Sequence, residues 1–173
     1  KVKVLGNPTE GALLLWLRSQ GVDYQLLKSN TVTTEELPFS TERKYMATVV
    51  NSSLGKRVVY VKGAPEIVHS LCKATSNGVD RESIESQLLA YQAQAMRTLG
   101  FAYQILEDGD VAIQDGKVVA DNLTFLGVVA IADPVREDVP AAVAECLNAG
   151  IAVKIVTGDT PGTAKEIGRQ IGL

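Results

Sequence analysis

The residues with the clearest chemical potential form the run Lys62-Gly63-Ala64-Pro65-Glu66. This run directly follows four apolar residues, Val58-Val59-Tyr60-Val61, which predict a buried strand. A lysine at the end of such a strand is placed at a pocket mouth, although most strand-end lysines are plain surface residues. Glycine lets a ligand approach the backbone closely, and proline can begin the helix that follows. The pattern favours a pocket for a flat, anionic ligand.

A second candidate site is Thr157-Gly158-Asp159, which lies between the apolar run 151–156 and a predicted helix over 163–171. In open α/β sheets ligands bind beyond the carboxyl ends of the strands, and the N–H groups of a helix start favour a phosphate oxygen. Thr157 can donate a hydrogen bond, and Asp159 can orient a cation or a metal-bound water. In the simpler alternative, Asp159 or Thr160 only caps the helix.

Phe39 and Lys44 belong to a polar turn that begins at Pro38. Phe39 either anchors the core at the start of a strand or offers a ring on which a purine base stacks. Lys44 either reaches the same ligand or, together with Arg43, keeps the turn solvated. Both alternatives are open from the residues alone.

Glu10 and Arg97 lie near the predicted ends of two helices. Glu10 follows Asn7-Pro8-Thr9, where an acidic side chain is favoured by the helix dipole. It can also accept a hydrogen bond from an exocyclic amine such as that of adenine. Arg97 precedes Leu99-Gly100, where a helix end favours a cation. Its guanidinium can alternatively bind the phosphates of a ligand.

Composition excludes several classes of function. The chain has 173 residues, of which 46% are hydrophobic and 21% charged, with a net charge of -3. It therefore lacks the basic field that a nucleic-acid-binding protein needs. Two distant cysteines, Cys72 and Cys146, fit a reducing compartment, and the single histidine, His69, has no metal-ligand pattern around it. No run approaches the ~18 apolar residues of a membrane span. We interpret the chain as a piece of a larger protein.

The first part of the chain predicts a mixed sheet with antiparallel pairs. Asn51 to Gly55 marks a hairpin turn, and Asp115-Gly116 is a turn signal that brackets a solvent-exposed connection. Strands are expected over 1–5, 24–27, 46–50, 57–62 and 101–106, helices over 9–20, 65–72 and 81–98, and polar loops over 31–34 and 76–78.

From Leu123 onward the pattern changes to strand–helix–strand–helix. Continuous apolar runs over 126–132 and 151–156 predict strands buried on both faces of a parallel sheet. Helices are expected over 139–148 and 163–171, which together indicate a doubly wound α/β unit. We place a domain boundary near 123–130, with domains over 1–125 and 126–173.

Taken together, these segments resemble the cytoplasmic part of a P-type cation-transporting ATPase over essentially the whole chain. Several separate motifs occur in the order that the family shows, which is more specific than any one of them. The matching segments are Gly6-Asn7-Pro8-Thr9-Glu10-Gly11-Ala12-Leu13, Pro38-Phe39-Ser40-Thr41-Glu42-Arg43-Lys44, Lys62-Gly63-Ala64-Pro65-Glu66, Ala95-Met96-Arg97-Thr98-Leu99-Gly100, Asp133-Pro134-Val135-Arg136 and Thr157-Gly158-Asp159.

The resemblance implies an α/β fold in two parts. Residues 1–125 would form an α+β nucleotide-binding (N) domain, whose mixed, largely antiparallel sheet is flanked by helices. Residues 126–173 would form part of a haloacid-dehalogenase-like phosphorylation (P) domain.

The resemblance also implies an ATP site. Phe39 would stack on adenine, Glu10 would hydrogen-bond the base, and Lys44, Lys62 and Gly63 would line the pocket. In the same family pattern, Arg97 would reach the phosphates and Leu99 would line the pocket. Asp133 and Arg136 would belong to the hinge, and Thr157, Gly158 and Asp159 would hold the transferred phosphoryl group.

For the parent protein the resemblance implies ATP hydrolysis through an aspartyl-phosphate, with Mg²⁺, coupled to cation transport across a membrane. The stretch 133–159 is most similar to plasma-membrane, secretory and bacterial calcium pumps. Two residues depart from that pattern, Thr41 where arginine is frequent and Thr160 where asparagine is common.

The family's Asp-Lys-Thr-Gly-Thr segment, which carries the phosphorylated aspartate, is absent from this chain, as is its Gly-Asp-Gly segment. This chain is therefore expected to bind ATP weakly and to hydrolyse none. The resemblance also implies that it faces the cytoplasm, and we expect it to be a monomer. Its expected partners are the remaining phosphorylation, actuator and transmembrane domains. The alternatives are a standalone nucleotide-binding regulatory module without transport and a phosphatase of the haloacid dehalogenase type.

Overall fold

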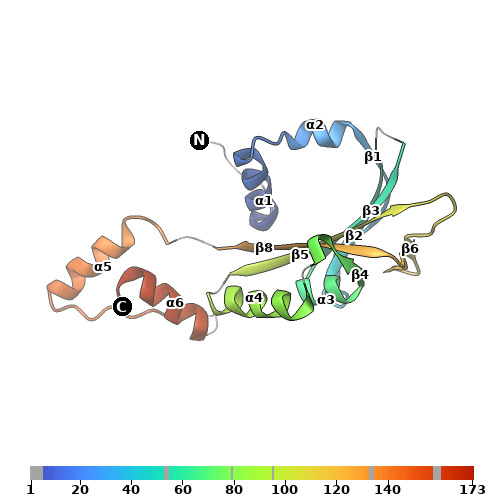
Figure 1. Ribbon diagram of the computed structural model, residues 1–173. Coiled ribbons are helices and arrows are strands. Elements are labelled where there is room, and N and C mark those ends of the chain that lie inside the picture. Colours follow the sequence, from blue (N-terminus) through green and yellow to red (C-terminus); the bar gives the residue numbers. More distant parts are fainter. Residues whose placement is uncertain (1–5, 53–54, 79, 95, 133–134, 158–160) are drawn as a thin grey trace. The chain divides into compact units, whose positions relative to one another are not determined.

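The computed structural model describes residues 6–52, 55–78, 80–94, 96–132, 135–157 and 161–173. The chain divides into two compact units (Figure 1). The first comprises Lys1–Asp80 with Leu99–Val129, and the second comprises Arg81–Thr98 with Ala130–Leu173. The predicted strand over 1–5 falls outside the described residues.

A six-stranded mixed sheet is the main element of the fold, with the strand order β1-β2-β3-β5-β8-β4. The pairs β1–β2, β2–β3 and β3–β5 are antiparallel, and β4–β8 is parallel. This mixed, mostly antiparallel sheet with flanking helices confirms the predicted fold class. The strands are β1 (Thr31–Leu37), β2 (Tyr45–Ser52), β3 (Arg57–Gly63), β4 (Cys72–Thr75), β5 (Arg97–Leu106) and β8 (Leu123–Ile131).

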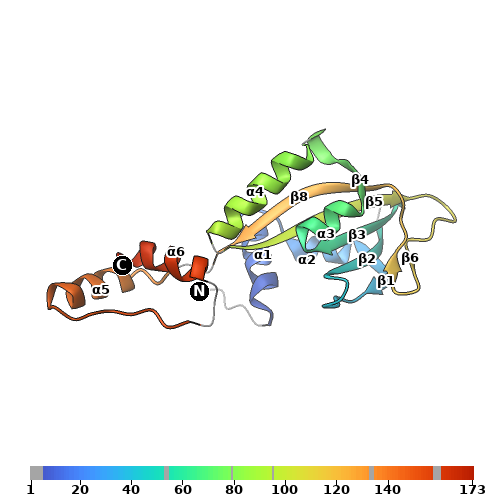
Figure 2. The same ribbon diagram turned by 90° about the horizontal axis from the view of Figure 1, so that it is seen from below.

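The two faces of the sheet in the first unit have different roles. Helix α3 (Pro65–Ser70) lies on one face, and helices α1 (Pro8–Ser19) and α2 (Tyr24–Ser29) lie on the other (Figures 1 and 2). The α3 face holds the core, because alternate strand residues such as Val49, Val59 and Val61 are fully buried there, as is Val68 of α3. The opposite face is left more open and carries the residues considered below.

The strands predicted on either side of 51–55 are confirmed, and the turn predicted at Asp115-Gly116 is present. Strands β2 and β3 form the expected hairpin, and the turn Asp115-Gly116 joins β6 (Ile113–Gln114) to β7 (Lys117–Val118). Asp115 and Gly116 both have positive φ angles, 50° and 70°, as a tight two-residue hairpin requires. The backbone N–H of Val118 donates to the hydroxyl oxygen of Tyr45 at 3.2 Å, which fixes this small hairpin to β2.

Several local predictions were wrong, because short segments take their structure from caps and from neighbouring strands. Residues 24–27 are helical in α2, since the Asp23 side chain accepts hydrogen bonds from the N–H groups of Gln25 and Leu26. Residues 31–34 are not a loop but the start of β1, whose threonines and valine suit a strand and pair with β2. The helix predicted over 65–72 ends at Ser70, and Cys72 instead begins β4.

The predicted helix over 81–98 ends early. Helix α4 covers Arg81–Ala93, and β5 already begins at Arg97. Pairing with β3 across seven residue pairs, from Gly100 to Leu106, favours the extended form over a longer helix. Arg97 therefore opens a strand and does not end a helix.

In its described residues, the second unit contains helices but no second sheet of the predicted kind. Helices α5 (Val139–Asn148) and α6 (Pro161–Ile171) are present, as expected, and contact each other. The residues predicted as the first strand of this unit, 126–132, instead lie almost entirely in β8. The second predicted strand, 151–156, is not a strand in the described part of the chain. Val156, in this run, is 96% exposed, whereas a strand buried on both faces would cover it.

Candidate functional site: a cleft between helix α1 and the sheet

The N-terminus of α1 places Glu10 at the open face of the sheet. The Asn7 side chain accepts a hydrogen bond from the Thr9 N–H at 2.9 Å, and Pro8 occupies the first helical turn. The run Asn7-Pro8-Thr9 therefore fixes where the helix begins. Glu10 then lies in the first turn, with its side chain 57% exposed.

Lys62 reaches the same place from the sheet. On β3 it pairs with Met46 of β2 on one side and with Phe101 of β5 on the other. Strand alternation puts these three side chains on the α1 face. The Lys62 ammonium donates to Glu10 Oε1 across 3.2 Å, and the lysine side chain is only 26% exposed. The two residues form an ion pair at the mouth of a cleft.

The cleft itself has a volume of about 590 Å³, which lies within the usual range for small-molecule sites. Its walls are mainly apolar, with Glu10 and Lys62 as the charged members. Helix α1 supplies Leu13, Leu14, Trp16 and Leu17, and the sheet supplies Phe101 and the segment 126–129. The three leucines recur at helical spacing, and all of them line this cleft. All of these residues belong to the first unit.

The loop over 38–44 connects β1 to β2 and is fastened to the Lys62 segment. Lys44 has a left-handed backbone with φ 61°, and its carbonyl accepts a hydrogen bond from the Ala64 N–H at 2.9 Å. Phe39 is 57% exposed, which excludes the alternative that it anchors the core. An exposed aromatic ring and the Lys62 ion pair thus lie at the same end of the β2–β3 hairpin.

Comparison with known proteins identifies the family of this chain. The family described as "P-type ATPase, cytoplasmic domain N" matches residues 1–138. The chain belongs to this family of P-type ATPase N domains. The resemblance seen in the sequence motifs is confirmed.

Relatives of this N domain extend over nearly all of the chain. It is 34% identical to the calcium-transporting ATPase PAT1 of Dictyostelium discoideum, over 100% of this chain and 16% of the relative. It is 34% identical to the calcium-transporting ATPase of Bacillus subtilis, over 97% of this chain and 20% of the relative. It is 38% identical to the sodium/potassium exporting P-type ATPase cta3 of Schizosaccharomyces pombe, over 98% and 17%. The chain thus spans about a fifth of the length of these relatives.

Two glycines of the N domain motifs have a packing role that the sequence did not reveal. Gly63 and Gly100 face each other across β3 and β5. A Cβ atom on Gly63 would lie 2.6 Å from Tyr45 Cα, and one on Gly100 would lie 2.8 Å from Pro65 Cα. The sequence suggested that Gly63 gives room to a ligand. The structure shows that its missing side chain gives room to the backbone of β2.

The remaining predicted site residues are not all brought together by the structure. Leu99 precedes Phe101 by two positions on β5, so strand alternation places it on the α1 face. Arg97 and Thr157 belong to the second unit, and their relation to the cleft stays a prediction. Arg136, in the same unit, pairs with Asp138 at 3.6 Å. Asp133, Gly158 and Asp159 lie outside the described residues.

Phe101 and the segment 126–129 are cleft residues that the sequence analysis missed. Phe101 could have been found by counting register, because it pairs with Lys62 on the neighbouring strand. Gly127 adopts φ 147°, a conformation that residues with a side chain rarely adopt. Nothing in the local sequence showed that 126–129 would face α1.

Cys72 and His69 contribute to packing in the first unit. Burial raises the pKa of the Cys72 thiol to about 11, so this group stays protonated at neutral pH. The His69 ring packs edge-on against Phe125, with ring centroids 5.0 Å apart. Among the described residues there is no group of three or more His, Cys, Asp and Glu that could hold a metal ion. Within the same residues, no helix has the length and apolar character of a membrane span.

Proposed function

We propose that the α1 cleft and the loop over 38–44 together form the ATP site of this N domain. The observation that carries the proposal is the Lys62–Glu10 pair, 3.2 Å apart above an apolar cleft. A purine offers an exocyclic amine to a carboxylate and accepts hydrogen bonds from an ammonium group, so it can interact with both partners. The apolar walls and the exposed Phe39 ring suit the flat faces of the base.

Each site residue then has a distinct role in binding. Phe39 stacks on adenine, Glu10 accepts from its amine, and Lys62 donates to the base or to the first phosphate. Lys44 and Arg97 attract the phosphates, and Leu99 lines the pocket. Gly63 lets β2 and β3 approach each other closely enough to form the edge of the pocket. In the second unit Asp133 and Arg136 form the hinge, while Thr157, Gly158 and Asp159 bind the transferred phosphoryl group.

The domain division proposed from the sequence is N domain over 1–125 and part of the phosphorylation domain over 126–173. It is supported by the family match over 1–138 and by the two helices α5 and α6 that follow β8. The parent would be an integral membrane protein whose actuator, phosphorylation and transmembrane parts are the partners of this segment. This segment would face the cytoplasm.

The parent is proposed to couple ATP hydrolysis, through an aspartyl-phosphate, to calcium transport. Mg²⁺ would accompany the ATP phosphates and neutralise their charge. Calcium is supported by the names of the relatives from Dictyostelium discoideum and Bacillus subtilis. The relative from Schizosaccharomyces pombe is named a sodium/potassium exporter, so uptake of calcium and efflux of sodium by the full-length parent in vesicles are the deciding measurements. The chain itself lacks the Asp-Lys-Thr-Gly-Thr segment and is proposed to bind ATP without hydrolysing it.

The single tryptophan makes the ATP site directly testable. Trp16 is the only tryptophan in the chain, and it lines the cleft. Titration of the chain with ATP should change Trp16 fluorescence in a saturable way, with a weaker response to GTP and no phosphate release. Phe39→Ala and Lys62→Ala should weaken binding.

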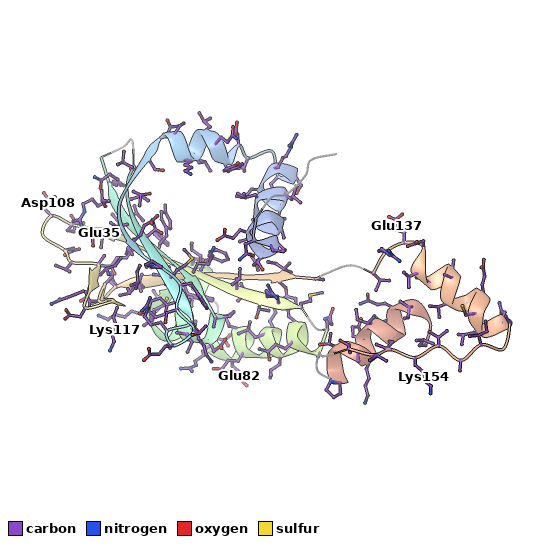
Figure 3. The ribbon with its side chains drawn as sticks, turned by 180° about the vertical axis from the view of Figure 1, so that it is seen from behind. Glu35, Glu82, Asp108, Lys117, Glu137 and Lys154 are labelled. Carbon is purple, nitrogen blue, oxygen red and sulfur yellow. The ribbon has the colours of Figure 1, made fainter. Side chains whose placement is uncertain are left out.

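The matched control for Lys62 is Lys117→Ala. Lys117 is an exposed strand lysine on the β6–β7 hairpin, away from α1 (Figure 3). The Lys117→Ala variant should bind ATP with the same affinity as the wild type. Equal ATP affinity in the wild type, Phe39→Ala and Lys62→Ala would refute the site.

A further inference from the structure

The loop over 38–44 is closed on itself by hydrogen bonds. The Ser40 hydroxyl oxygen accepts from the N–H groups of Glu42 and Arg43 at 3.2 Å each. The Lys44 N–H donates to the Ser40 carbonyl at 2.7 Å. These contacts order the residues from Ser40 to Lys44. None of them involves Pro38 or Phe39, at the start of the loop.

The start of the loop is held by Arg43. Its Nη2 donates to the Pro38 carbonyl at 2.7 Å, which joins the end of the loop to its start. The side chain is half-buried, and Nε is buried without an acceptor in the part of the chain that the structure describes. A buried donor without an acceptor destabilises the fold. Arg43 thus lies against the loop, with Nε enclosed and Nη2 bound to the Pro38 carbonyl.

We infer that Arg43 is a positioning residue, which holds the Phe39 ring in the orientation that stacks on the base. Pro38 directly precedes Phe39, so the Arg43–Pro38 hydrogen bond fixes the backbone from which the ring projects. A loop that is ordered before binding loses less conformational entropy when the ligand arrives. The inference rests on the proposed nucleotide site, and it assigns Arg43 a role separate from the ligand-facing lysines.

Binding measurements on three variants, Arg43→Met, Phe39→Ala and the combination of both, test whether Arg43 acts through Phe39. Arg43→Met keeps the length of the side chain and removes its donors. It should weaken ATP binding by about three- to tenfold, through the lost preorganisation. Phe39→Ala combined with Arg43→Met should bind no more weakly than Phe39→Ala alone, because the two residues act as one unit. Additive losses in the double variant would overturn the inference, since Arg43 would then act independently.

Arg57→Met is the matched control for this series. Arg57 also donates to a backbone carbonyl, that of Asp110 at 3.4 Å, and pairs with Glu35 at 3.6 Å. It lies at the opposite end of β3 from Lys62, and Glu35 is labelled in Figure 3. This variant should leave ATP affinity unchanged. A loss equal to that of Arg43→Met would show a general effect of removing an arginine and would overturn the inference.

A measurement without ligand separates this inference from the ATP site itself. The Lys44 N–H donates to the carbonyl of Ser40, two residues after Pro38, so opening of the loop start that Arg43 holds should also expose this amide, and its hydrogen-exchange rate reports that opening in the free chain. Arg43→Met should raise that rate about tenfold or more while the amides of β2 and β3 keep their protection. An unchanged Lys44 rate would overturn the inference even if ATP binds as proposed. If the rate rises but Phe39→Ala and Lys62→Ala do not affect ATP binding, the nucleotide site is refuted, and with it the stacking role of Arg43.

Discussion

Glu10 and Lys62 are 52 residues apart in the chain, yet their charged groups lie 3.2 Å apart at the mouth of the α1 cleft. Glu10 comes from the first turn of helix α1, and Lys62 is the second-to-last residue of strand β3. Each alone has an ordinary structural explanation. Their meeting above an apolar cleft is what makes a binding site the better explanation.

Removing either charge of this pair should affect binding far more than stability. The Glu10 side chain is largely exposed, and exposed ion pairs stabilise a fold by only about 0–1 kcal/mol. Glu10→Gln should therefore change the free energy of unfolding by less than about 1 kcal/mol. The same variant should reduce the preference for ATP over GTP, measured by Trp16 fluorescence. A loss of preference that comes with global unfolding would contradict this prediction.

Phe39→Ala should likewise separate binding from stability. Because the ring is 57% exposed, its removal should change the unfolding free energy by about 0.5 kcal/mol or less. Loss of base stacking should weaken ATP binding by ~1–3 kcal/mol. Tyr24→Ala, which removes another exposed aromatic ring from α2, is the control and should bind ATP normally. Chemical denaturation and ATP titration of both variants check the prediction.

Gly63→Ala and Gly100→Ala should act in the opposite way and destabilise the sheet. Each new methyl group would meet backbone atoms of Tyr45 or Pro65 that have little room to move. Overpacking of this kind costs about 1–3 kcal/mol, and a backbone contact places these variants toward the upper end. Gly168→Ala is the control, because its new Cβ would make only an ordinary contact, 3.5 Å from Ile155 Cδ1. Urea denaturation that leaves Gly63→Ala as stable as the wild type would show that β2 can shift away.

The second unit should lose stability in acid through Glu166. A hydrogen bond from Arg169, with a second from Gln170, lowers the pKa of Glu166 from its usual 4.5 to about 2. Between these two values the unfolded chain binds more protons than the folded chain. The stabilisation is therefore complete above about pH 4.5 and is lost as the pH falls toward 2.

Thermal unfolding of Glu166→Gln between pH 5 and pH 2 checks the acid prediction. The variant should show a flatter pH dependence than the wild type over this window. Glu137→Gln, which removes an exposed carboxylate of the same unit, should keep the wild-type slope (Figure 3). A carboxyl titration by NMR that places the pKa of Glu166 near 4.5 would remove the basis of the prediction.

Much of the fold could be predicted because certain residues are compatible with only one local backbone conformation. Asp115-Gly116 adopts positive φ angles that suit a tight hairpin, and the leucines of α1 recur at helical spacing. The order of the motifs from Gly6 to Asp159 was enough to identify the family. These features depend on neighbouring residues or on a linear pattern, so no tertiary contact is needed to predict them.

Elsewhere the local pattern was compatible with two structures, and only the tertiary contacts decided. Tyr24 to Leu27 is helical because Asp23 caps it, and the segment from Gly100 to Leu106 is a strand because it pairs with β3 in a ladder. The run 151–156 has no such ladder in the described chain and is not a strand.

The sequence by itself determined which chemical groups this protein has and which family it belongs to. The tertiary structure decided which of those groups meet. It joined Glu10 to Lys62, bound Arg43 to the Pro38 carbonyl, and used Gly63 to admit a neighbouring strand. The physical reason is that side-chain identity is fixed residue by residue, whereas distances between residues far apart in the chain follow from strand register and helix packing.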